Sequence, residues 1–97
     1  MMRITQQRDG ETIALKIEGC LTGEWADEME RCWNEVKNDA QLRVIRIDLT
    51  GVTFIDAAGR ELLARMFASG VIAAAVNVMT RTVVEKLTGN AQLTQES

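Results

Sequence analysis

The stretch from Asp48 to Phe67, DLTGVTFIDAAGRELLARMF, constrains the fold most because its hydrophobic pattern changes halfway along. Over residues 44–49, which lead into this stretch, apolar and polar residues alternate, and this alternation is typical of a strand with one buried face. From Ala57 onward, apolar residues recur every three or four positions, which predicts an amphipathic helix. Asp56 stands at the junction, where its carboxylate can accept hydrogen bonds from the first free amides of that helix. The stretch therefore predicts a strand, a turn and a helix capped by Asp56.

The rest of the chain predicts short strands that alternate with helices. Asp9-Gly10 is a strong signal for a tight hairpin turn, since both residues tolerate a positive φ. The two strands that it joins pair antiparallel, whereas each later strand follows a helix and pairs in parallel. We expect strands over residues 4–8, 12–18, 44–49 and 71–76. We expect helices over 24–38 (introduced by Thr22 and Gly23), over 57–69 with Gly70 just after it, and from a cap at Thr80 or Thr82 to Gly89.

These elements define an α/β fold class, a β-β-α-β-α-β-α mixed sheet with helices mainly on one face. Polar residues at alternate strand positions indicate that the other face is open to water or to a partner. A chain of 97 residues has room for one modest core. We expect a single domain over residues 1–97, with 90–97 as a polar C-terminal tail.

Composition and charge exclude several classes of function. The formal net charge is -3 and the basic residues are scattered, which argues against a nucleic-acid partner. No apolar run approaches the roughly 20 residues of a membrane span, and the N-terminus lacks the apolar core of a signal peptide. We therefore expect a cytoplasmic protein without direct membrane insertion. Cys20 and Cys32 lack metal-binding spacing and are typical of small buried hydrophobes.

Histidine is absent, which excludes Ser-His-Asp and Cys-His nucleophiles and any histidine-ligated metal. No motif brings two carboxylates together for acid–base work. We expect no enzyme activity, no metal and no cofactor. Trp25 and Trp33 lie on the apolar stripe of the first helix, and we interpret both as packing that helix onto the sheet.

The turn at Asp56 lies where open α/β sheets bind ligands. Amides of Ala58, Gly59 and Arg60 point outward there and would form an anion site. However, the Asp56 carboxylate competes for the same amides and repels a phosphate, and no glycine-rich phosphate loop is present. A purely structural cap and a ligand site both stay open on this evidence.

The segment VIRIDLTGVTFIDAAGRELLARM resembles the central motif of the STAS family, which is named for sulfate transporters and anti-sigma-factor antagonists. The family pattern is a hydrophobic strand, then D-L-[ST]-G-V-x-F-[IM]-D-[SA]-[SAT]-G, then a helix. The matching residues are Asp48, Leu49, Thr50, Gly51, Val52, Phe54, Ile55, Asp56 and Gly59. The order of elements and the segment IEGCLTGEW match as well, so the resemblance covers nearly the whole chain.

The resemblance implies a non-enzymatic switch protein in bacterial transcription regulation. Anti-sigma-factor antagonists bind an anti-sigma factor, often a serine kinase, which phosphorylates the hydroxyl residue just before the motif glycine. That position is Ala58 here, preceded by Ala57, and neither side chain carries an oxygen. Thr53 stays open as a substitute site, and we expect Thr50 to bond its own turn backbone.

The implied partner-binding surface consists of Phe54, Asp56, Ala57, Ala58, Gly59 and Arg60. Its expected partner is an anti-sigma factor or a serine-kinase-like protein. Two alternatives stay open: an accessory subunit of a membrane transport ATPase, and a sensor that holds a nucleotide or lipid beside Asp56. Many family members continue with a further strand and helix after the third helix. We therefore expect an uncovered edge, which a homodimer would cover.

Overall fold

The computed structural model describes residues 1–88, and the predicted tail 90–97 and helix end at Gly89 lie outside them. Seven elements follow one another: β1 (Met2–Asp9), β2 (Thr12–Leu21), α1 (Gly23–Lys37), β3 (Val44–Ile55), α2 (Ala57–Ala68), β4 (Ile72–Ala75) and α3 (Val78–Thr88). The strands form one sheet in the order β1-β2-β3-β4. β1 pairs antiparallel with β2, and the other two pairings are parallel. The predicted fold class and element order are confirmed.

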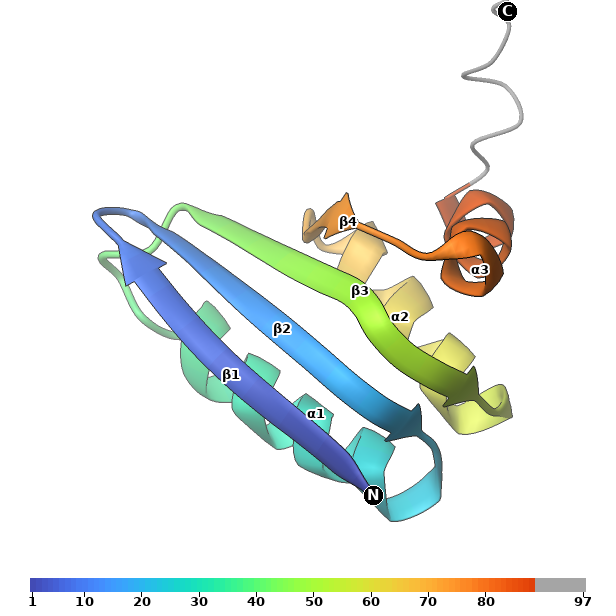
Figure 1. Cartoon of the computed structure of the whole chain (residues 1–97). Helices are drawn as coiled ribbons and strands as arrows, with labels where there is room; N and C mark the ends of the chain where they lie inside the picture. Colours follow the sequence, from blue (N-terminus) through green and yellow to red (C-terminus); the bar gives the residue numbers. More distant parts are fainter. Residues whose placement is uncertain (89–97) are drawn as a thin grey trace, which may run out of the picture.

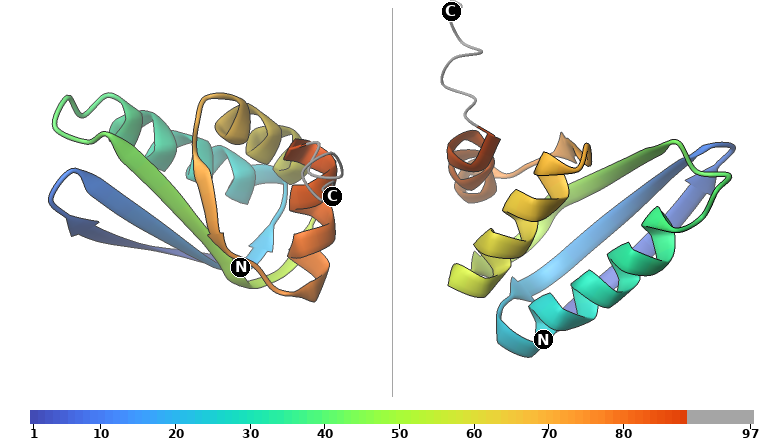
Figure 2. Two further views of the ribbon diagram at one scale, coloured as in Figure 1. Left: turned by 90° about the horizontal axis from the view of Figure 1, so that it is seen from above. Right: turned by 180° about the vertical axis from the view of Figure 1, so that it is seen from behind.

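The helices cover one face of the sheet. α1 and α2 lie behind it in Figure 1 and in front of it in the view from behind, where they run side by side (Figure 2). Arg65 on α2 forms a 2.7 Å ion pair with Glu30 on α1. α3 packs against α2 and β3 at the β4 side of the molecule. Within residues 1–88, no helix covers the opposite face, which therefore presents the polar side chains of the strands.

The core lies between this sheet and the two helices. It takes every second residue of the central strands and one stripe of each helix, as the two periodicities predict. Its fully buried members include Leu15, Ile17, Leu21, Met29, Ile47, Leu49, Val52, Leu62, Leu63 and Met66. Trp33 is buried among them, whereas Trp25 at the start of α1 is only half-buried.

β3 is longer than its pattern predicts, since it continues to Ile55 instead of ending at Leu49. Gly51 resembles a turn residue in the sequence, but two register shifts in the β2–β3 pairing accommodate it within the strand. Thr50 stabilises this region, because its amide and its hydroxyl both donate to Oδ1 of Asp48, at 2.9 and 2.7 Å. The extension places Phe54 on a strand rather than in a loop.

The predicted start of α3 at Thr80 or Thr82 is wrong, because the helix begins at Val78. Asn77 and Thr80 cap it reciprocally. The Thr80 amide donates to Oδ1 of Asn77 at 2.8 Å, and the Asn77 amide donates to Oγ1 of Thr80 at 2.8 Å. Asn77 Nδ2 also donates to the carbonyl oxygen of Val52 at 2.8 Å. The carbonyl oxygens of Thr50 and Leu49 lie 3.2 and 3.4 Å from the same nitrogen. One side chain thus begins α3 and fastens it to the irregular part of β3.

These contacts predict that Asn77→Asp destabilises the protein although aspartate is a good helix cap. The carboxylate keeps the acceptor for the Thr80 amide, but it loses the Nδ2 donor and faces carbonyl oxygens. We expect Asn77→Asp and Asn77→Ala each to lower the free energy of unfolding by about 1–3 kcal/mol in urea denaturation. An aspartate variant as stable as the wild type would show that the contacts to β3 contribute nothing.

Candidate functional site

Asp56 lies between β3 and α2 and joins the starts of two helices. Its Oδ1 accepts a hydrogen bond from the amide of Gly59 at 2.8 Å, which confirms it as the cap of α2. Its Oδ2 accepts from the amide of Gly23, the first residue of α1, at 3.0 Å. Thr22 precedes α1 but makes no side-chain cap bond. One carboxylate therefore caps both helices.

Gly59 brings the first turn of α2 against the ends of the central strands. A Cβ at this position would collide with the carbonyl oxygen of Leu21 and crowd the side chain of Ile55. The amide of Asp56 donates to that same carbonyl oxygen at 3.3 Å. Gly59 is buried, so the absence of its side chain first serves packing inside the fold.

The hydrogen bonds at Asp56 hold the pKa of its carboxyl below the ordinary value. The largest cause is the bond from the Gly59 amide. The amides of Gly23 and Ala58 and the charge of Arg60 act in the same direction, while desolvation opposes them. A carboxyl whose pKa is lower in the folded state stabilises the fold above its unfolded pKa of about 4 and loses that contribution as the pH falls through the folded pKa.

Replacing Asp56 with asparagine should therefore change how stability depends on pH. The amide side chain can still cap one helix, but it presents a donor to the other amide and carries no charge. We expect a lower Tm at pH 7 and a smaller loss of Tm between pH 5 and pH 2 than in the wild type, measured by circular dichroism. Parallel curves for the two proteins would contradict the assigned role of Asp56.

The six residues predicted to bind a partner do not share one surface. Phe54 is 57% exposed. Ala57, Ala58 and Arg60 are exposed as well, Asp56 is half-buried, and Gly59 is buried. The accessible part of the predicted surface is thus Phe54, Ala57, Ala58 and Arg60, with Asp56 and Gly59 holding it from beneath. We call these four residues the loop surface.

The loop surface adjoins a groove against α3, which we call the α3 groove. It has a volume of about 440 Å³ and is lined by Thr53, Phe54, Ile55, Arg60, Met79, Thr82 and Val83. Met79 is 37% exposed and its neighbour Val78 is 88% exposed. The contribution of α3 to this site was not predicted from the sequence. The available signal was the spacing of Asn77 and Thr80, which would have placed Val78 and Met79 in the exposed first turn of a helix.

Ala58, the position that the sequence resemblance implies as the usual phosphosite, carries an exposed methyl group in the first turn of α2. Thr53, the candidate substitute, lies on β3 with an exposed side chain, and its Oγ1 is 3.8 Å from the sulfur of Cys20. Within residues 1–88, no three acidic or cysteine side chains come together as metal ligands. No helix in the same range has the length and apolar content needed to cross a membrane.

The model of the STAS domain family matches residues 3–78, and the chain therefore belongs to this family. The match ends at the first residue of α3, so the three residues of α3 that line the groove lie beyond it. Comparison with curated proteins gave no match.

Solved structures share the fold at low sequence identity. The chain is similar to the unphosphorylated form of the anti-sigma factor antagonist SpoIIAA, with 17% identity, a TM-score of 0.68, and coverage of 90% of this chain and 84% of that one. It is also similar to Mglu, with 23% identity and a TM-score of 0.60 over 75% of this chain. The chain spans only 19% of the length of that Mglu chain.

Proposed function

We propose that the protein is a non-enzymatic regulatory module that binds a protein partner through the loop surface and the α3 groove. Membership of the STAS family supports a regulatory role, and the likeness to SpoIIAA supports the comparison with an anti-sigma-factor antagonist. The partner we favour is an anti-sigma factor or a serine-kinase-like protein.

The observation that carries this proposal is the exposed aromatic ring of Phe54 beside an apolar groove. Large apolar side chains that a fold leaves accessible next to a concavity are typical centres of protein interfaces. Arg60 lies at the same groove and supplies a charged rim. The surface combines an apolar centre with a polar edge, as protein interfaces do.

A phosphate ligand is a poorer fit to this site. The Gly59 amide at the start of α2 already donates to the carboxylate of Asp56. An incoming phosphate would have to displace that carboxylate and would meet its negative charge. For the small-ligand alternative, the Gly59 amide is therefore already engaged and the charge of Asp56 opposes an anionic ligand.

We also propose that phosphorylation at position 58, the usual position in the family, does not control partner binding in this protein. A phosphate in the first turn of α2 would add about -1.5 to -2 units of charge beside the carboxylate of Asp56. Ala58 has no atom that can accept that group. We propose that the protein stays competent to bind its partner unless another residue, such as Thr53, is modified.

The test is affinity capture from the host lysate with the wild type, Ala58→Asp and Ala68→Asp as baits. Ala68 is exposed at the far end of α2, so the same substitution there controls for added charge. We expect a kinase-like ATPase with the wild type and the Ala68→Asp variant but not with Ala58→Asp. Capture of transport ATPase subunits in that pattern would favour the accessory-subunit alternative. Identical captures with all three baits would contradict a contact at the loop surface.

With the captured partner in hand, Phe54→Ser should weaken binding about tenfold or more, because truncation removes the apolar centre of the interface. Ile72→Ser is the matched control, since Ile72 is 48% exposed on another strand. Isothermal titration calorimetry of both variants gives the comparison. Equal losses for the two variants would mean that Phe54 has no special place in the interface.

A further inference from the structure

β1 is a long sheet edge with nothing paired along its outer side within residues 1–88. Its eight residues bond β2 on one side only, whereas the opposite edge, β4, has four residues. Figure 1 shows β1 running along the margin of the sheet, and Figure 2 shows no described segment outside it. An unpaired strand of this kind can pair with another chain.

The register identifies which backbone groups point outward. Cys20 donates its amide to the carbonyl oxygen of Met1, so these two residues form a hydrogen-bonded pair. Hydrogen-bonded and non-hydrogen-bonded pairs alternate along an antiparallel ladder. Arg3, Thr5 and Gln7 therefore direct their amides and carbonyls toward β2. The residues between them direct theirs to the free edge: Met2, Ile4, Gln6 and Arg8.

β1 lacks several devices that commonly protect an edge. It contains no proline, and its pairing with β2 runs from Met2 to Asp9 without a bulge. The side chains of Met2 and Ile4 pack against the core but remain half-buried, so the core is incompletely covered at this edge. A partner strand would complete the hydrogen bonding of this edge.

The geometry points to a second copy of this chain as the occupant, paired antiparallel through β1. We place the two-fold axis at Gln6, so that each Gln6 faces its own copy. This register sets Arg3 of one chain opposite Asp9 of the other, and the symmetry repeats the pair. A shift that places Thr5 on the axis leaves Arg3 opposite Gln7 and loses both charge pairs. Charge complementarity therefore selects the register at Gln6.

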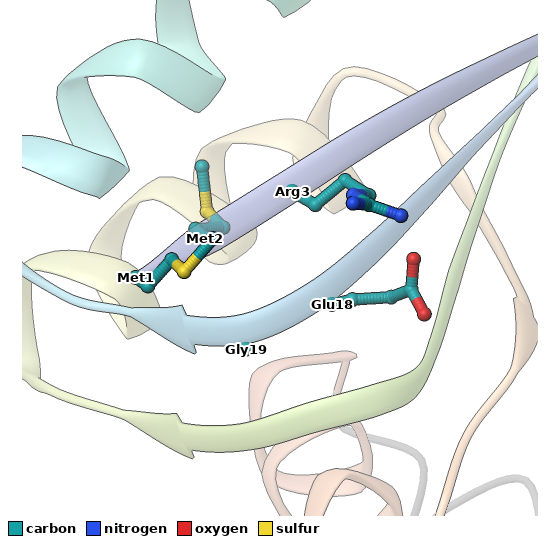
Figure 3. A pocket seen from close by; sticks show the side chains of 5 residues that line it. All are labelled: Met1, Met2, Arg3, Glu18 and Gly19. Carbon is teal, nitrogen blue, oxygen red and sulfur yellow. The ribbon is translucent and has the colours of Figure 1, made fainter.

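The position of the Arg3 side chain, on the same side of the sheet as that of Glu18, favours this pairing. Arg3 and Glu18 are cross-strand neighbours, and Figure 3 shows their side chains on the same side of the sheet. The residues lining this shallow depression, about 300 Å³, are Met1, Met2, Arg3, Glu18 and Gly19. In the dimer, the Arg3 guanidinium would lie between Glu18 of its own chain and the Asp9 carboxylate of its copy. Two carboxylates would then balance each guanidinium.

The dimer would leave the loop surface and the α3 groove open. β2 separates β1 from β3, which carries Phe54, and α3 packs against α2 and β3 at the opposite side of the sheet. Four strands from each copy would form one continuous sheet, with the helices of both copies on the same face. Two copies of the docking surface would then be available to a partner. This inference does not depend on what that partner is.

Cysteine crosslinking tests the pairing and its register together. In the proposed register Thr5 faces Gln7 of the other chain in a non-hydrogen-bonded pair, with Cα atoms about 4.5 Å apart, a separation that a disulfide can span. Both side chains are exposed. In a background with Cys20 and Cys32 replaced by alanine, we expect Thr5→Cys/Gln7→Cys to form disulfide-linked dimers under mild oxidation. Neither single variant should do so. A double variant that stays monomeric, or efficient crosslinking of Thr5→Cys alone, would overturn the proposed pairing.

Sedimentation of the full chain with native cysteines provides the second test. Gln6→Pro removes an outward amide and places the ring against the partner strand, while leaving the inward ladder to β2 intact. We expect the wild type to show a concentration-dependent dimer and Gln6→Pro to sediment as a folded monomer at the same concentrations, with circular dichroism as the check on folding. A wild type that is monomeric up to millimolar concentration would overturn the proposal. A dimer that persists in folded Gln6→Pro would do the same.

Discussion

The two hydrogen bonds that Asp56 accepts hold this structure together at the end that carries the loop surface. One carboxylate receives the first amide of α1 and an early amide of α2, two groups that lie far apart in sequence. Each helix thereby begins at a set distance from the other and from the ends of β2 and β3. Gly59 permits this arrangement, because any side chain there would strike Leu21.

This arrangement explains why the turn offers so little chemistry. A helix start after a parallel strand usually provides free amides for an anion, but here the protein's own carboxylate accepts from the Gly59 amide and places its negative charge at the site. The accessible groups are the aromatic ring of Phe54, the methyl groups of Ala57 and Ala58, and the charged side chain of Arg60. We propose that this surface serves recognition by another protein. Ala58 adds only a methyl group to this surface, and that side chain has no hydroxyl that a kinase could phosphorylate.

The sequence predicted the fold well wherever the determining interactions are local. Alternation along the strands and the stripe from Ala57 depend on neighbouring residues, and so does the cap from Asp56 to Gly59. Three features escaped prediction. The bond from Gly23 to Asp56 spans 33 residues. The extension of β3 through Gly51 depends on a register shift against β2. The α3 groove depends on the hydrogen bonds that Asn77 makes with β3. Spacing within one segment cannot reveal these pairings.

The central claim is that one carboxylate secures both helix starts and so presents the loop surface. Amide hydrogen exchange at Gly23 and Gly59, followed by NMR in the wild type and in Asp56→Ala, tests it most directly. The account predicts that both amides are protected in the wild type and that both lose protection together in the variant, while the amides of the central strands keep theirs. If only Gly59 loses protection, Asp56 is an ordinary cap of α2 and the link between the two helices is contradicted.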